Sequence, residues 1–203
     1  MNQLLKEKQI LPIDSKDNCV VEKFLGSGGQ GEVYEVSIQG KKYALKWYFP
    51  KQATSEQKAG LENLIRIGAP NEKFLWPKYL LTHPVNNTFG YIMPLRLAQF
   101  KGINDLMRRK VEPTFKALAI AGVHLANSFA KLHSKGLCYR DISFGNLFFD
   151  PVSGDIQICD NDNVTTNGNP VATILGTPRF TAPEIVILKM FFKFSVFLCR
   201  SCR

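Results

Sequence analysis

The sequence predicts an α+β fold of two lobes: a five-stranded antiparallel sheet with one helix, followed by a helical lobe. Short β-prone segments separated by glycine turns fill most of the chain up to residue 95. One segment with helical character, residues 54–67, lies among them. After residue 95 the pattern changes, and residues 113–135 form a long segment with helical periodicity.

Turn residues delimit the elements of the first lobe. The predicted strands are residues 19–25, 32–38, 42–48, 76–81 and 88–93. Glycines separate the first two strands, and Gln39-Gly40 forms the turn before the third. The helix at residues 54–67 contains no proline, and Ala69-Pro70-Asn71 ends it.

In the second lobe the helix at residues 113–135 starts with Pro113 in its first turn and stops at Gly136. We expect a buried helix, because its apolar residues form a broad face: Phe115, Leu118, Ala119, Val123, Leu125, Ala126, Phe129 and Leu132.

A β-hairpin is predicted next, with strands at residues 147–149 and 156–159 and strong turn chemistry at 150–155. The hairpin places Asn146 and Asp160 at the ends of its two strands. Side chains in such positions can act together as metal ligands.

Composition limits the classes of partner and compartment. The chain has 203 residues, 45% of them hydrophobic, which is typical of a soluble globular protein. The net charge of +9 comes from scattered basic residues, so we expect no nucleic-acid partner. Residues 1–14 have mixed charges and no apolar core, so we expect no signal peptide, and no apolar run in the sequence is long enough for a transmembrane helix. The odd number of cysteines, five, favours a reducing, cytoplasmic location.

Several motifs follow one another in an order that carries the functional prediction. Residues 26–33, Gly-Ser-Gly-Gly-Gln-Gly-Glu-Val, read G-x-G-x-x-G-x-V, and Lys46 follows at the end of an apolar strand. Residues 140–146 read R-D-x-x-x-x-N, Asp160 follows an apolar run, and residues 182–184 are Ala-Pro-Glu. Phosphoryl transfer from ATP requires these parts: a phosphate cover, a cation, a base and two metal ligands.

On these motifs the chain resembles the protein kinase superfamily from about Val20 to Glu184. The resemblance implies ATP and Mg²⁺ as cofactors and a protein substrate that offers a Ser or Thr hydroxyl. Residues 176–181, Gly-Thr-Pro-Arg-Phe-Thr, resemble Ser/Thr-specific kinases. The resemblance implies an N-terminal extension (1–18), a kinase N-lobe (19–95), a partial and incomplete helical C-lobe (96–184) and an atypical tail (185–203), where we expect the catalytic domain to be truncated. Without the missing helices, we expect much apolar surface between Phe115 and Leu132 to be uncovered.

The resemblance also assigns roles to residues. Asp141 is the base that accepts the hydroxyl proton, and Asn146 and Asp160 hold Mg²⁺. Lys46 pairs with phosphates and with a carboxylate on the helix. Glu62, near the helix middle, is favoured for that carboxylate over Glu56, whose position suits the helix dipole.

The resemblance implies that the nucleotide contacts the glycine motif, the strand that carries Lys46 and a hinge whose first residue is Pro94. Met93 is the gatekeeper, Pro94 offers only its carbonyl, and Arg96 supplies the next backbone donor. The residues assigned to ATP are Leu25, Gly26, Ser27, Gly28, Gly29, Gln30, Gly31, Val33, Ala44, Lys46, Met93, Pro94 and Arg96.

Arg140 can pair with a phosphorylated activation loop, for which Thr165, Thr166 and Thr173 are candidate acceptors, although each also fits a plain polar loop.

The chain departs from the family at a few positions. Tyr139 replaces the usual histidine, Ser143 replaces a lysine that neutralises the γ-phosphate, and residues 160–162 read Asp-Asn-Asp in place of D-F-G. Such variants resemble those of some bacterial eukaryotic-like (Hanks-type) kinases. Two alternatives to an active kinase therefore stay open: a nucleotide-binding pseudokinase that acts as a scaffold, and a non-functional fragment.

Overall fold

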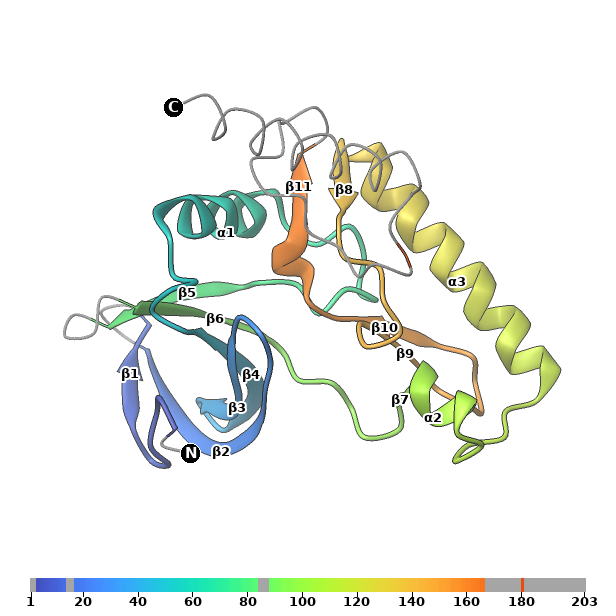
Figure 1. The fold of residues 1–203 in the computed structure, drawn as a ribbon, viewed down its shortest axis with the longest axis horizontal. Helices are drawn as coiled ribbons and strands as arrows, with labels where there is room; N and C mark the ends of the chain where they lie inside the picture. Colours follow the sequence, from blue (N-terminus) through green and yellow to red (C-terminus); the bar gives the residue numbers. More distant parts are fainter. Residues whose placement is uncertain (1–2, 14–16, 84–87, 167–179, 181–203) are drawn as a thin grey trace, which may run out of the picture.

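The computed structural model describes residues 3–13, 17–83, 88–166 and 180. Within them the chain folds into a mixed α/β structure whose largest part is an antiparallel sheet (Figure 1). The smaller sheets and the long helix that follow in the chain lie to the right of the large sheet in Figure 1. This arrangement agrees with a fold of two lobes in that chain order.

In the described part of the chain the large sheet has six strands in the order β1-β2-β3-β4-β6-β5. Every neighbouring pair in it is antiparallel. The strands are β1 (Ile10–Pro12), β2 (Asn18–Ser27), β3 (Gly31–Ile38), β4 (Lys41–Tyr48), β5 (Tyr79–His83) and β6 (Thr88–Pro94). All five predicted strands are present, but the fourth starts at Tyr79 and not at residue 76.

The additional strand, β1, comes from the segment that the sequence assigns to an N-terminal extension. It pairs with the start of β2, with Leu11 opposite Cys19. Leu5 and Leu11 are 2% exposed and pack into the core of the sheet. A strand of three residues is too short to show a period of two, so burial against β2 decides its conformation.

Helix α1 (Ser55–Ile67) matches the predicted helix closely. The Thr54 hydroxyl accepts a hydrogen bond from the Gln57 N–H at 3.2 Å, which satisfies one of the free donors of the first turn. The helix ends at Gly68, whose φ of 75° favours glycine. Leu61 and Leu64 form its buried face.

The second region contains β7 (Lys101–Gly102), α2 (Ile103–Met107), α3 (Phe115–Ser134), β8 (Leu137–Tyr139), β9 (Leu147–Phe149), β10 (Ile156–Ile158), the 3₁₀ helix η1 (Asn161–Asn163) and β11 (Val164–Thr166). The predicted hairpin is confirmed as β9 and β10, which pair antiparallel. The sequence missed β7 and α2, and missed the pairing of β8 with β11.

The broad apolar face predicted for α3 is covered only in part, and the uncovered apolar surface expected between Phe115 and Leu132 is present. Phe115 is 86% exposed and Val123 is 58% exposed. The side of the helix that packs against the rest of the chain carries Ala117, Ala121, Leu125, Ser128, Phe129 and Leu132. Gly154 lets the hairpin turn approach α3 closely, because a Cβ at this position would lie 2.4 Å from the Ala117 carbonyl oxygen.

One buried cluster joins the two regions. Leu64 of α1 and Phe74 and Trp76 of the following loop pack with Leu132 of α3 and Ile158 of β10. The loop also pairs with β10 through its backbone, because Leu75 N–H donates to the Ile158 carbonyl at 2.9 Å. The end of β10 is therefore held against the first region. Among the described residues, no helix is long and apolar enough to cross a membrane.

Candidate active site

The β9–β10 hairpin brings Asn146 and Asp160 to the same end of two paired strands. Leu147 pairs with Ile158, and beyond this pair the Cys159 N–H donates to the Asn146 carbonyl at 2.9 Å. Asn146 precedes the first strand of the hairpin and Asp160 follows the second, so both residues lie at the end of the hairpin away from its turn.

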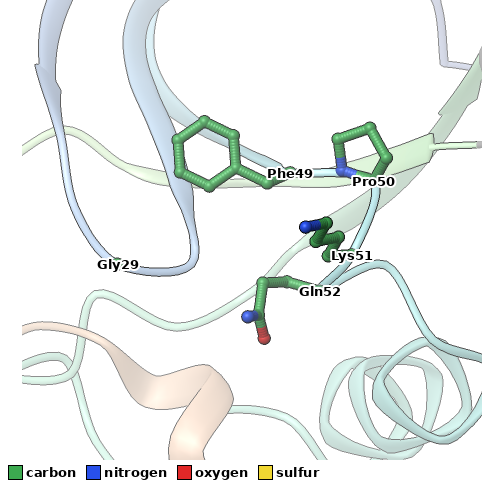
Figure 2. Close-up of a pocket in the computed structure, with 5 residues that line it drawn as sticks. All are labelled: Gly29, Phe49, Pro50, Lys51 and Gln52. Atoms are coloured by element: carbon green, nitrogen blue, oxygen red, sulfur yellow. The ribbon is translucent and has the colours of Figure 1, made fainter.

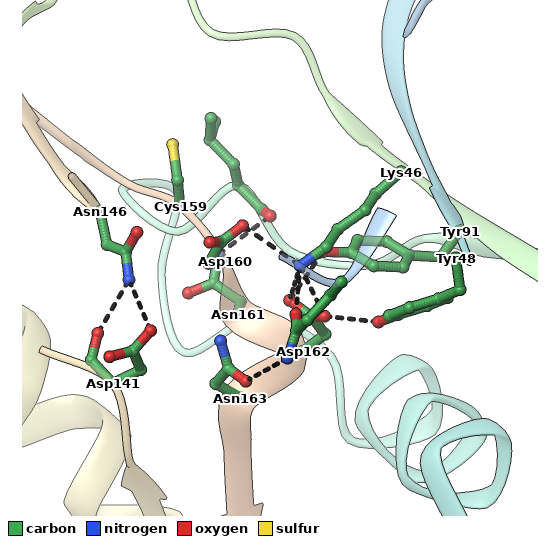
Figure 3. Close-up of polar contacts among 12 residues, drawn as sticks. Lys46, Tyr48, Tyr91, Asp141, Asn146, Cys159, Asp160, Asn161, Asp162 and Asn163 are labelled. Carbon is green, nitrogen blue, oxygen red and sulfur yellow. Dashed lines mark hydrogen bonds and ion pairs between the residues drawn. The ribbon is translucent and has the colours of Figure 1, made fainter. Parts of the chain in front are cut away.

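Asn146 also orients the loop that carries Asp141 (Figure 3). Its Nδ2 donates to the Asp141 backbone carbonyl at 2.8 Å and lies 3.5 Å from Asp141 Oδ2. Because the amide nitrogen faces Asp141, the amide oxygen is the atom that Asn146 can offer to a cation. The candidate base and a candidate metal ligand are thus coupled through one buried side chain.

Asp160 has the backbone conformation of a left-handed residue, with φ 51° and ψ 44°. Aspartate tolerates this region better than most residues do, and such conformations are frequent at functional sites. Burial, and secondarily the neighbouring Asp162, raise the pKa of Asp160, although Lys46 opposes them. A divalent cation would relieve this repulsion between carboxylates, so the donor set fits a hard metal ion.

Lys46 on β4 is buried, with 5% of its surface exposed. Its ammonium lies 2.9 Å from Asp162 Oδ2 and 3.4 Å from Asp160 Oδ1 (Figure 3). It also lies 2.8 Å from Gln30 Oε1. Burial lowers the pKa of Lys46, but the two aspartates outweigh it and the net shift is upward. The lysine is therefore a charged group at the centre of the site.

Asp162 is the most enclosed carboxylate of the site, with a side chain that is 0% exposed. The Tyr91 hydroxyl donates to its Oδ1 at 2.9 Å, and the Tyr48 hydroxyl donates to its Oδ2. Burial opposes ionisation, but Lys46 and the hydrogen bonds from Tyr48 and Tyr91 outweigh it and lower the pKa of Asp162. A buried charge of this kind is tolerated only because it is paired and hydrogen-bonded.

The structure does not bring Glu62 to Lys46, which corrects the expectation that Glu62 pairs with the lysine. Glu62 is exposed on α1, while its neighbour Leu61 faces the core. One residue along a helix rotates the side chain by roughly 100°, so Glu62 points away from the buried face. Glu56, the other candidate, is also exposed.

Sequence reasoning missed the residues that surround Lys46. Tyr48, Tyr91 and Asp162 were not assigned to the site, and Gln30 was assigned to ATP and not to Lys46. The signal available for Asp162 was the second carboxylate of Asp160-Asn161-Asp162, because a buried lysine needs a charged partner. For the tyrosines, strand alternation places residues 46 and 48 on one face.

The glycine loop connects β2 and β3. A Cβ at Gly26, Gly28 or Gly29 would meet nothing within 4 Å, so the loop leaves open the space that a phosphate needs for close approach. Gly31 has a different function, since a Cβ there would lie 2.1 Å from the Trp47 carbonyl oxygen. These glycines fit a phosphate-binding loop whose last glycine serves strand packing.

The predicted hinge follows β6. Met93 of β6 is buried and lies directly opposite Ala44 of β4. Residues in this register share one face of the sheet, as two residues of one nucleotide slot should. Arg96 lies beyond Pro94, and its guanidinium packs 4.4 Å from the centre of the Phe148 ring while donating to the Phe100 carbonyl. Leu25 and Val33 contribute further apolar surface, and Leu25 is 42% exposed.

Two of the family departures acquire a structural explanation. The Tyr139 hydroxyl donates to the Cys159 carbonyl, and its ring packs edge-on against Phe129. Asn161 donates from its Nδ2 to the Leu75 and Ile158 carbonyls, at 3.0 and 2.9 Å. Both side chains therefore support the segment that carries Asp160 by polar contacts.

The activation-loop predictions are tested only in part. Arg140 donates from Nε to the Asn163 carbonyl at 3.1 Å, so it contacts the segment after Asp160 without a phosphate. Thr165 and Thr166 lie in β11, paired with β8. Thr173, residues 176–179 and 181–184, and the tail at 185–203 lie outside the described residues. Phe180 is described, and its ring packs edge-on against Phe144.

An open hollow of about 410 Å³ lies beside the tip of the glycine loop (Figure 2). It is lined by Gly29, Phe49, Pro50, Lys51 and Gln52. Phe49 N–H donates to the Gln30 carbonyl at 2.9 Å, which ties this wall to the loop. None of the residues assigned to catalysis or to the metal lines the hollow.

Comparison with known proteins agrees with this geometry. The profile of the protein kinase domain matches residues 19–194. The chain is 26% identical over 173 residues to Protein kinase MCK1 of Saccharomyces cerevisiae, which covers 80% of this chain and 46% of the relative. It is 29% identical over 204 residues to Serine/threonine-protein kinase SBK1 of Danio rerio, covering 90% and 49%.

A third relative is the interferon-induced, double-stranded RNA-activated protein kinase of Rattus norvegicus, 30% identical over 189 residues, with 84% of this chain and 36% of the relative covered. The chain therefore spans less than half the length of each of these relatives. The profile match covers most of the sequence and includes the glycine loop, Lys46, Asp141 and Asp160. The chain belongs to the protein kinase family.

Proposed function

We propose that this chain is the catalytic part of a protein serine/threonine kinase that uses Mg²⁺ and ATP. The single observation that carries the proposal is the convergence of Lys46 from β4, Asp141 and Asn146 from the loop before β9, and Asp160 from the segment after β10 (Figure 3). A structural role alone gives no reason for a buried lysine, two carboxylates and an amide to meet beside an open glycine loop. Relatives named as Ser/Thr kinases add support.

The roles follow from the chemistry of the side chains. When bound, Mg-ATP supplies the phosphoryl group and the charge that polarises it. Lys46 pairs with phosphate oxygens as a cation, and Asn146 Oδ1 and the Asp160 carboxylate hold the metal. Asp141 orients the acceptor hydroxyl and accepts its proton. The slot formed by Val33, Ala44 and Met93 receives the adenine.

The Tyr-Arg-Asp and Asp-Asn-Asp variants are compatible with this function. Tyr139 and Asn161 replace the usual residues and still hold the Asp160 segment through hydrogen bonds. We therefore assign the chain to a variant subgroup of kinases in which polar contacts do what apolar packing does elsewhere.

The alternative is a nucleotide-binding pseudokinase, and one observation favours it. Ser143 stands where a second cation is usual, so the site has less positive charge for the transition state. Such a protein would bind the nucleotide without transferring its phosphate.

The experiment that separates the two functions measures phosphoryl transfer. The chain is incubated with radiolabelled ATP, Mg²⁺ and pools of peptides that carry Ser, Thr or Tyr as the acceptor, and the modified amino acid is identified by mass spectrometry. We expect label on Ser and Thr peptides and none on Tyr peptides. ATP binding without any transfer would favour the pseudokinase, and label on Tyr alone would refute the assigned specificity.

A further inference from the structure

We propose that Asp162 is the positioning residue of Lys46 and takes the role that the resemblance assigned to a carboxylate on helix α1. The inference rests on the proposed function, because it concerns how Lys46 is held for phosphate. It differs from that function in naming the residue that holds the lysine.

The groups around the Lys46 ammonium are of two kinds. Asp162 is fixed: its side chain is fully enclosed, and hydroxyl donors from Tyr91 and Tyr48 reach its two oxygens. Tyr48 is itself held by Gln57 of α1, whose Nε2 donates to the Tyr48 hydroxyl at 3.1 Å. The carboxylate therefore has no freedom to follow a ligand.

The other two groups are exchangeable. Gln30 is a neutral side chain on the glycine loop, so a phosphate oxygen can replace its amide oxygen at the ammonium. Asp160 has 39% of its side chain exposed and is the assigned metal ligand. An ammonium has three protons to donate. One of them stays on Asp162, while the others are available when nucleotide and metal bind.

Helix α1 offers no competing carboxylate at this place. The α1 residue in polar contact with the cluster is Gln57, which is neutral and reaches Tyr48. Glu56 and Glu62 are exposed. The position of Lys46 is therefore set by the segment that also carries Asp160, so the phosphate-pairing cation and the metal ligand are positioned together.

The test measures how much Lys46 contributes to nucleotide binding in different backgrounds. The dissociation constants of Mg-ATP and of adenosine are measured by calorimetry for the unmodified chain, for Lys46→Met, for Asp162→Asn and for the double variant. In the unmodified background, Lys46→Met should weaken Mg-ATP about 10-fold, as for the loss of one hydrogen bond to a charged group, and leave adenosine unchanged. In the Asp162→Asn background the same change should weaken Mg-ATP by less than about 3-fold, because the lysine is no longer positioned.

Glu62→Gln is the matched control, since it removes the carboxylate that the sequence favoured. In this background Lys46→Met should again cost about 10-fold. A full effect of Lys46 in Asp162→Asn, or its loss in Glu62→Gln, would overturn the proposal. An enlarged effect in Asp162→Asn would also overturn it, since Asp162 would then restrain the lysine from binding phosphate.

Unchanged adenosine binding shows that Asp162→Asn is folded. If Asp162→Asn no longer binds adenosine, the test uses Tyr91→Phe in its place, because this change removes one hydrogen-bond donor to Asp162 and keeps the aromatic ring. The contribution of Lys46 should then fall, and a full contribution in Tyr91→Phe would refute the proposal. Mg-ATP bound no more tightly than adenosine by the unmodified chain would instead count against the proposed function itself.

Discussion

Lys46 and Asp162 are 116 residues apart in the chain, yet Lys46 Nζ lies 2.9 Å from Asp162 Oδ2 in the interior of the protein. This ion pair joins β4 of the large sheet to the short helix η1 after the β9–β10 hairpin. It connects the two regions of the chain at the candidate active site. Its burial makes both partners sensitive to the loss of the other.

The first prediction concerns stability. Lys46→Met leaves the Asp162 carboxylate buried without its cation, and removal of one partner of a buried ion pair costs about 3–5 kcal/mol. Lys46→Met/Asp162→Asn should be destabilised by less than the sum of the two single changes, as measured by urea unfolding. The losses in unfolding free energy caused by Lys46→Met and by Glu62→Gln should add in the double variant. Additive costs for Lys46 and Asp162 would contradict the pairing.

The second prediction concerns the metal. ATP should bind more tightly with Mg²⁺ than with EDTA, and Asp160→Asn or Asn146→Ala should reduce this difference, because each removes one oxygen ligand. Titration calorimetry with and without Mg²⁺ measures it. Asp155→Asn is the control, since Asp155 lies in the same hairpin but pairs with Lys73. An unchanged Mg²⁺ effect in both test variants would exclude these ligands.

The third prediction concerns Tyr139. Tyr139→Phe keeps the packing against Phe129 but leaves the Cys159 carbonyl without its hydroxyl donor. We expect a loss of about 1–3 kcal/mol in unfolding free energy, as is usual for a buried group whose partner is removed. Tyr79→Phe, at a ring that is 44% exposed, should change the stability little. Equal effects of the two changes would show that the Tyr139 hydroxyl contributes nothing.

The fourth prediction concerns Cys159. Burial, and secondarily Asp160, raise the pKa of its thiol to about 12. The thiolate is the reactive form, and it is scarce below that pKa. Iodoacetamide at pH 8 should therefore modify Cys159 slowly in the native chain and rapidly after unfolding in urea, as followed by peptide mass spectrometry. Equal rates in the two states would mean that this part of the site is open to solvent.

Local patterns in the sequence were sufficient for most elements of the large sheet, for α1 and for the β9–β10 hairpin. Each of these has a clear period or strong turn residues, such as the Gly68 stop of α1. The patterns failed for β1 and β7, which are too short to show a period. They also could not tell which part of the apolar face of α3 is covered, because an apolar face does not by itself say how much of it a neighbour covers.

The residues of the site were also predictable only in part. The motifs identified Lys46, Asp141, Asn146 and Asp160, since their residue types and spacing are tied to the chemistry. The partner of Lys46 depended on which side of α1 faces inward, and the exposed position of Glu62 corrects that prediction. Asp162 could be recognised only once the turn after β10 had placed it beside β4, which is a tertiary property.

The most direct test of the central claim compares the unmodified chain with Asp141→Asn. We measure the rate of phosphate transfer to a Ser/Thr peptide and the affinity for Mg-ATP on the same samples. Asp141 acts on the acceptor hydroxyl, so the rate should fall at least about 100-fold, as for the loss of a general base. The affinity for Mg-ATP should stay within a few-fold. Transfer that persists at the original rate in Asp141→Asn would contradict the account.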